Sequence, residues 1–186
     1  MRGIEGVLAR YDEVVRMPWD RTVAGPQKVW FAVYDPAQER RLRLRVNEFA
    51  IATQRAGYGW SLIDLTAAFA RWMAGHRYRE AYFEDPADMQ LALETFAHDL
   101  AAEVGARLSA PDADEETVVA VMGLASLFGL ARASALIEAV APAIRGRLLV
   151  FFPGQYENAA YRLLGARDGW NYLAIPITAA DDEQST

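Results

Sequence analysis

The chain has 186 residues, of which 53% are hydrophobic and 24% are charged, and its formal net charge is −6. This balance is typical of one compact soluble domain with a buried core. It excludes a strongly basic protein and a disordered chain of low hydrophobicity.

The composition also indicates a compartment. There is no cysteine, which excludes disulfides and thiolate metal sites and favours the reducing cytoplasm. The N-terminus carries charges every few residues and lacks the apolar core of a secretion signal. The most apolar region, Thr117–Ile144, is interrupted by Arg132 and Glu138, so we expect it to be buried core and expect no membrane span.

The first expected elements are a helix, a loop and a strand. Apolar residues recur every three to four positions over Ile4–Met17, which predicts an amphipathic helix. Met17–Gln27 contains two prolines and a glycine, and it is a predicted loop. Val29–Tyr34 is a continuous run of strand-favouring apolar residues, so we expect a buried strand there.

Two Asp-Pro dipeptides mark expected helix starts. Asp35-Pro36 and Asp85-Pro86 each offer an N-cap followed by proline at the first helical position. Gln38 adds a capping box to the first of them, and this helix should extend to Gly57. The second helix keeps its apolar period as far as Leu108 and is the longest expected.

The remaining expected elements alternate between strands and helices. In chain order they are the strand Ser61–Leu65, the helix Thr66–Met73, an acidic loop at Asp112–Glu116, the strand Thr117–Met122, the helix Ala133–Ile144, the strand Leu148–Phe152, the short helix Ala159–Leu164 and the strand Tyr172–Ile175. Strands that are apolar on both faces and separated by helices predict an α/β fold, with a mostly parallel sheet of about five strands covered by helices on both faces.

The expected organisation is a single domain. Residues 1–27 are predicted to form an N-terminal helix and linker that pack on the core, residues 28–178 the α/β domain, and residues 179–186 a disordered acidic tail. The pattern does not predict the strand order. A flavodoxin-like order and the order of a P-loop nucleoside-triphosphatase core that lacks the P-loop both remain open.

Four sequence blocks carry a family resemblance. The longest is Arg145–Ile177, which contains RGRLLVFFPGQYENAAYRLL, and the others are Lys28–Pro36 (KVWFAVYDP), Trp60–Leu65 (WSLIDL) and Val118–Phe128 (VVAVMGLASLF). In this order they resemble the DUF1788 family, the BrxB components of BREX bacteriophage-exclusion systems, over roughly Val7–Ile177. The resemblance implies a non-catalytic adaptor or scaffold of an antiviral complex, with other BREX proteins as partners and the alkaline-phosphatase-like PglZ protein foremost among them.

The expected partner-binding site follows the strand Leu148–Phe152. Pro153 and Gly154 predict a sharp turn, after which amide, phenol and carboxylate groups come together around tyrosines, a composition favoured at protein interfaces. The predicted partner-binding residues are Pro153, Gly154, Tyr156, Glu157, Asn158 and Tyr161. A purely structural alternative remains open, in which Glu157 or Asn158 caps the short helix and Tyr156 packs on the rim of the sheet. A second aromatic cluster lies at Trp72–Tyr82.

The sequence predicts neither a nucleotide cofactor nor a metal. A P-loop needs glycine amides followed by Lys-Ser or Lys-Thr, whereas Asp35-Pro36 follows the first strand and Lys28, the only lysine, precedes it. His76 and His98 are the only histidines, and even if His76 shared a helical face with Glu80, two ligands would not make a site.

Two other functions remain as alternatives. Asp64, Ser126 and Glu157 are candidates for a small hydrolase or nucleotide-binding site at the strand ends, although single carboxylates there are commonly helix caps. Arg40, Arg41, Arg43 and Arg45 crowd one helix and are candidates for nucleic-acid binding. Glu39 and Glu48 lie within reach of these arginines, so an ion-paired surface is the favoured interpretation and direct nucleic-acid binding is not expected.

Overall fold

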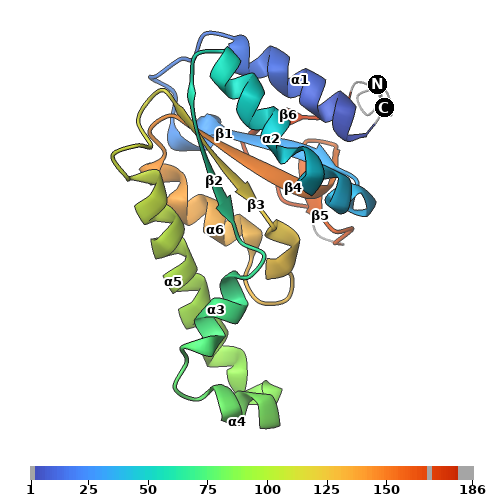
Figure 1. Cartoon of the computed structure of the whole chain (residues 1–186). Coiled ribbons are helices and arrows are strands. Elements are labelled where there is room, and N and C mark those ends of the chain that lie inside the picture. Colours follow the sequence, from blue (N-terminus) through green and yellow to red (C-terminus); the bar gives the residue numbers. More distant parts are fainter. Residues whose placement is uncertain (1–2, 167–168, 180–186) are drawn as a thin grey trace.

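Six strands form one sheet in the computed structural model, which describes residues 3–166 and 169–179 (Figure 1). Five strands follow the order β2-β3-β4-β1-β6, and each neighbouring pair is parallel, while β5 pairs antiparallel with the outer part of β4. In chain order the strands are β1 (Val29–Tyr34), β2 (Gly59–Asp64), β3 (Thr117–Met122), β4 (Arg147–Glu157), β5 (Ala160–Leu163) and β6 (Ile175–Ile177). The predicted α/β class with a mostly parallel sheet is confirmed.

The first strand lies inside the sheet, between β4 and β6. Dinucleotide-binding folds have the order 3-2-1-4-5-6 and flavodoxin-like folds the order 2-1-3-4-5, so neither describes this chain. Of the two orders left open by the sequence, the flavodoxin-like one is therefore wrong. The other alternative, the strand order of a nucleoside-triphosphatase core, is not excluded by the observed order.

Helices cover both faces of the sheet, as predicted (Figure 1). They are α1 (Ile4–Arg16), α2 (Glu39–Arg55), α3 (Ala68–Ala74), α4 (Arg79–Glu84), α5 (Gln90–Leu108) and α6 (Ala133–Val140). Alternate residues of a strand point to opposite faces. Accordingly, Trp30 and Ala32 of β1 pack with α1 and α2, whereas Phe31 and Val33 pack with α5 and α6.

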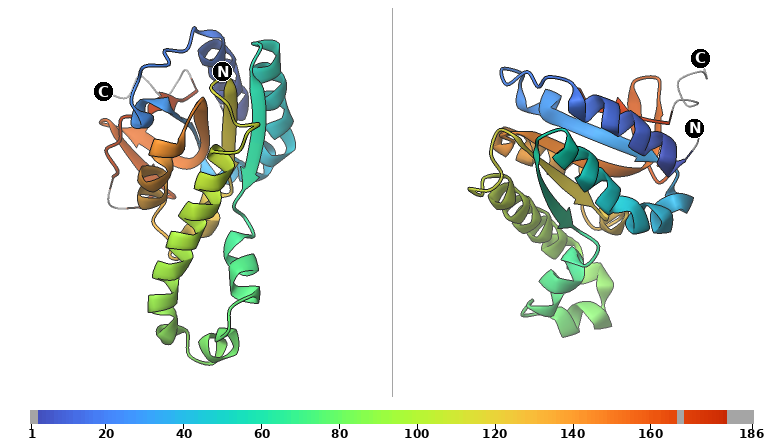
Figure 2. Two further views of the ribbon diagram at one scale, coloured as in Figure 1. Left: turned by 90° about the vertical axis from the view of Figure 1, so that its left-hand side faces the viewer. Right: turned by 45° about the horizontal axis from the view of Figure 1, so that its top comes forward.

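One part of the structure extends away from the sheet. It comprises α3, α4 and the first half of α5, residues 68–100, and we call it the arm (Figure 2). Helix α4 was not expected from the sequence, and none of its residues is buried.

Both Asp-Pro dipeptides begin helices in the predicted way. The carboxylate of Asp35 accepts the amide N–H of Ala37 at 2.9 Å, and that of Asp85 accepts the amide N–H of Ala87 at 3.1 Å. Each pair opens a short 3-10 turn that continues into α2 or α5. The predicted capping box is wrong, because the side-chain oxygen of Gln38 accepts the amide N–H of Ile4 at the start of α1 instead.

Proline shortens the helix predicted to end at Ile144. Helix α6 stops at Val140 and is followed by the 3-10 turn Ala141–Ala143. Pro142 has no N–H to continue the helical ladder. The acidic tail predicted for residues 179–186 lies outside the described residues except for Ala179.

Strand β4 continues through the dipeptide Pro153-Gly154. Its pairing with β3 ends at Val150 and its pairing with β1 ends at Pro153, after which it pairs with β5. A Cβ atom on Gly154 would lie 2.0 Å from the backbone oxygen of Arg162, so glycine permits the close approach of β5. The sharp turn predicted at this dipeptide is therefore wrong.

The predicted helix Ala159–Leu164 is also wrong, because these residues form the second half of a β-hairpin. The two-residue turn consists of Asn158 and Ala159, with φ angles of 50° and 57°. Positive φ at both central residues is the requirement of a type I′ turn, whose twist matches the flanking strands.

The last strand is shorter and later than the predicted Tyr172–Ile175. Strand β6 is Ile175–Ile177 and lies beside β1. The segment before it turns towards the hairpin, since the carbonyl oxygen of Ala174 accepts a hydrogen bond from the hydroxyl of Tyr161 at 2.9 Å.

The hairpin turn provides a test of this fold. Alanine at positive φ costs about 1 kcal/mol, and glycine removes this cost but loses more conformational entropy on folding. We expect Ala159→Gly to raise the free energy of unfolding by up to about 1 kcal/mol in urea denaturation. The matched control Ala160→Gly, one residue later in β5, should lower it by about 0.5–1 kcal/mol. Destabilisation by Ala159→Gly would contradict the turn geometry.

Candidate protein-binding surfaces

Ligands of open α/β sheets bind beyond the carboxyl ends of the strands. In this chain a side chain of the loop after β1 already binds a backbone amide of the same loop. The carboxylate of Asp35 accepts the amide N–H of Ala37, so this donor is not free for a ligand, and Pro36 has no N–H. The loop therefore presents an acid and a proline where a P-loop presents amide donors, in agreement with the sequence.

Arg43 of α2 bridges the ends of β1 and β2. Its guanidinium donates to Glu39 at 2.8 Å and to the hydroxyl of Thr66 at 2.7 Å, and it lies 3.5 Å from the carboxylate of Asp64. The hydroxyl of Tyr34 donates to the same Glu39 carboxylate. These groups form a connected polar network across the carboxyl edge of the sheet.

The network shifts the pKa values of two of its members. Burial, reinforced by the hydrogen bond to Glu39, raises the pKa of Tyr34 above its usual value. Partial burial raises the pKa of Asp64, but hydrogen bonds from Thr66 and the charge of Arg43 outweigh this effect, so the pKa of Asp64 lies below its usual range. Asp64 therefore acts as an ionised acceptor that holds the turn after β2.

The three residues of the predicted hydrolase site lie on separate features. Asp64 ends β2, Ser126 lies in a 3-10 turn after β3, and Glu157 ends the outer part of β4. Glu157 is four residues beyond Pro153, which faces Tyr34 in the sheet, or about 13 Å along the strand. Within the described residues, no hydrogen bond or ion pair joins any two of the three.

The arginines of α2 form the ion pairs expected from the sequence. Arg43 pairs with Glu39 and Arg45 pairs with Glu48, both along the helix. Arg41 and Arg45 also meet Glu5 of α1, a contact that the sequence did not predict. These pairs offset much of the positive charge that a nucleic acid would need. Arg40 is exposed.

The predicted partner-binding residues differ in accessibility. Pro153, Gly154 and Tyr161 are buried, and Tyr156 is half-buried. Glu157 and Asn158 are exposed near the tip of the hairpin, together with the neighbouring Gln155 and Ala159. Of the predicted residues, Glu157 and Asn158 are therefore the most accessible to a partner, and the binding itself remains a prediction.

Tyr161 fixes the hairpin to the sheet. Its side chain is 1% exposed, and its ring meets Phe31 edge-on, with 4.4 Å between the ring centroids. It also lies 4.6 Å from the ring of Tyr156. The backbone of Tyr161 exchanges two hydrogen bonds with that of Trp170, at 2.8 and 2.7 Å. Burial raises the pKa of Tyr161 above its usual value.

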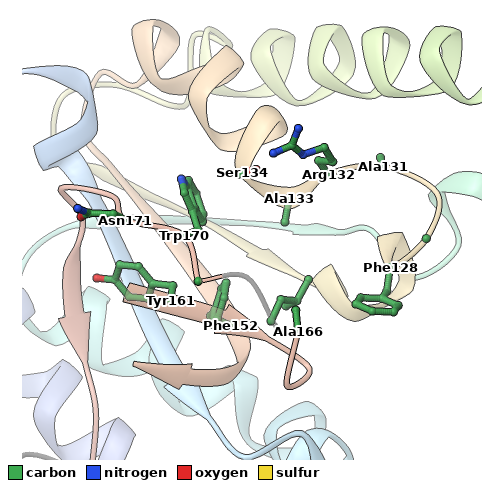
Figure 3. A pocket seen from close by; sticks show the side chains of 13 residues that line it. Phe128, Ala131, Arg132, Ala133, Ser134, Phe152, Tyr161, Ala166, Trp170 and Asn171 are labelled. Carbon is green, nitrogen blue, oxygen red and sulfur yellow. The ribbon is translucent and has the colours of Figure 1, made fainter. Parts of the chain in front are cut away.

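A cavity of about 590 Å³ lies between the hairpin and the loop that leads into α6 (Figure 3). Phe152, Tyr161 and Trp170 contribute aromatic walls, and Arg132 and Ser134 line it from the start of α6. The sequence did not predict this cavity, because its walls come from separate segments of the chain. None of the three residues of the predicted hydrolase site lines it, so it gives that alternative no support.

Aromatic contacts hold the arm together. Buried Phe96 of α5 lies 5.4 Å from the ring of Trp72, whose indole N–H donates to the carboxylate of Asp99 at 2.9 Å. The ring of His76 lies 4.7 Å from that of Trp72, and its Nδ1 accepts the amide N–H of Tyr78 at 3.2 Å. The predicted aromatic cluster Trp72–Tyr82 thus fixes the connection between α3 and α4.

The two histidines lie at separate places in the arm, His76 before α4 and His98 on α5. His76 precedes α4, which begins at Arg79, so His76 and Glu80 do not share one helix. His98 is exposed on α5. In the part of the chain that the structure describes, no group of three or more His, Asp or Glu side chains is placed to hold a metal ion.

The apolar region Thr117–Ile144 folds as β3, a 3-10 turn and α6 with its following turn. Among the helices of residues 3–166 and 169–179, none has the length and apolar character needed to cross a membrane.

Comparisons of the sequence with protein-family models, with curated proteins and with solved structures found no match. The resemblance to the DUF1788 family therefore remains a prediction from the sequence.

The polar network at the carboxyl edge can be tested through its pH dependence. Because the pKa of Asp64 is lower in the folded state, its contribution to stability is present above about pH 4 and is lost as the pH falls through the folded-state value. Asp64→Asn keeps an oxygen acceptor for Thr66 but removes the charge facing Arg43. At neutral pH we expect the free energy of unfolding of the wild type to be about 0.5 kcal/mol higher than that of this variant, as for other partly exposed ion pairs. Urea denaturation at several pH values measures this difference, and a constant difference down to pH 2 would contradict the account.

Proposed function

We propose that this chain is a non-catalytic adaptor of a BREX antiviral complex and that it docks a larger partner such as the PglZ protein. The resemblance to the DUF1788 family suggests this role. The longest block of that resemblance, Arg145–Ile177, covers β4, the hairpin and β6. The longest block of the resemblance therefore includes the residues that form the hairpin surface.

The observation that carries the proposal is the construction of the hairpin. Its tip exposes Gln155, Glu157 and Asn158. Tyr161, which follows the hairpin turn in β5, is almost completely buried. Side chains on a backbone that is already ordered lose less entropy when a partner binds. An exposed polar tip on an anchored aromatic base suits recognition of another protein.

The carboxyl edge of the sheet supports the same proposal. Asp35, Glu39 and Asp64 are engaged with neighbouring groups, and Arg43 links two of them. A general base or a phosphate-binding group has to be available to its substrate. The arrangement is better suited to stabilising the loops than to chemistry.

Pull-down of the purified PglZ-type partner tests the proposed surface. We expect the double change Tyr156→Ala and Glu157→Ala to lower the affinity at least about tenfold, because it removes an aromatic contact and a charge from the tip. Glu157→Lys alone should also weaken binding, and it leaves the packing of Tyr156 on Tyr161 intact. The matched control is Arg10→Ala with Glu13→Ala, an exposed ion pair on α1.

The control variant should bind like the wild type. Equal binding by all variants would remove the hairpin as the docking surface. Failure of the wild type to bind any BREX protein would overturn the adaptor function itself.

A further inference from the structure

The end of the arm exposes large apolar side chains. Residues 78–94, which we call the arm tip, comprise α4, the 3-10 turn after it and the start of α5. Phe83 is 71% exposed, Leu91 is 78% exposed and Tyr78 is 53% exposed. Figure 2 shows that the arm tip is the part of the molecule farthest from the sheet. Three large apolar side chains exposed within one short segment indicate an interaction site more than single ones scattered over the surface do.

Carboxylates lie close in sequence to Phe83 and Leu91, whereas the guanidinium of Arg77, just before the arm tip, lies over the ring of Tyr78 at 5.2 Å from its centroid. The arm tip carries five carboxylates and one guanidinium. Glu80 precedes Phe83 by three residues on α4, and Glu94 follows Leu91 by three on α5, so each pair lies on one helix face. Asp88 lies three residues before Leu91, in the 3-10 turn.

Most of this charge is available to a partner. The guanidinium of Arg79 donates to the backbone oxygen of Ala74 at 2.7 Å. The carboxylate of Asp85 caps the following turn. The other four carboxylates of the arm tip make no ion pair within the described residues.

The base of the arm is ordered, which limits the cost of binding. Phe96 of α5 is buried against Phe69 and Trp72 of α3, whereas Leu91 is exposed on the same helix. The hydrogen bond from Trp72 to Asp99 joins α3 to α5, and the ring of His76 packs on that of Trp72. An apolar patch on such a support can enter a pocket with little further ordering.

We propose that the arm tip is a second docking surface, for a protein partner that presents an apolar pocket rimmed by Lys and Arg side chains. Phe83 and Leu91 enter the pocket, and the carboxylates of the arm tip face the basic rim. The acidic charge disfavours nucleic acid and anionic membranes as occupants. This inference rests on the adaptor function proposed above. It gives the adaptor a surface apart from the hairpin, so that two proteins can be bound together (Figure 1).

Binding of the full chain to each of the other purified BREX proteins tests the inference. Biolayer interferometry is performed at about 50 and 300 mM salt, concentrations that change the screening of exposed charges. Phe83→Ser or Leu91→Ser should weaken at least one complex about tenfold or more. Glu84→Lys with Asp88→Lys should weaken the same complex at low salt and reduce its dependence on salt. The matched control is Leu44→Ser, which changes a leucine that is 80% exposed on α2 and should have no effect.

The possible outcomes separate this inference from the adaptor function. If the wild type binds and the arm-tip variants bind equally well, docking at the arm tip is overturned while the adaptor function stands. If the wild type binds no BREX protein, both are overturned. If light scattering shows that the wild type dimerises and Phe83→Ser is monomeric, the occupant is a second copy of this chain and the stated partner is wrong. Unchanged thermal midpoints of the variants establish that the folds are intact.

Discussion

Burial of Tyr161 is the constraint on which the outer half of the structure depends. The crossover from β4 to β6 contains no helix in its described part, so this portion of the sheet face is covered by the hairpin and the residues that follow it. A phenol can be buried there because its hydroxyl donates to Ala174 and its ring packs on Phe31. The same side chain therefore completes the core, holds the segment before β6 and orders the exposed tip of the hairpin.

At the carboxyl edge of the sheet, where ligands of open α/β sheets bind, the polar side chains contact one another. The carboxylate of Asp35 accepts an amide of the loop after β1, and Arg43 joins the beginning of α2 to Asp64. The exposed polar groups of the hairpin and the apolar arm tip lie on separate parts of the surface. Under the proposed function, both surfaces would contact other proteins, and the sheet would support them.

The alternation of strands and helices could be predicted because it depends on local apolar periodicity and on caps such as Asp35. The hairpin could not be predicted in this way. Pro153-Gly154 has the composition of a turn, but Gly154 is needed for the approach of Arg162, which is known only once β5 is placed. The true turn at Asn158 lacks the glycine that usually signals a type I′ hairpin. Likewise, the exposure of the arm tip depends on how α3 packs on α5, and helical spacing alone does not determine it.

Native-state hydrogen exchange of the backbone amides of Tyr161 and Trp170 tests the central claim most directly. These amides bond to each other's carbonyl oxygens, and the account makes them part of the same cooperative unit as the core strands. They should then exchange only through global unfolding, with the same free energy of opening as the amide of Val150 in β4. Rapid exchange of both amides while Val150 stays protected would show that the hairpin opens independently, and it would contradict the anchored surface proposed here.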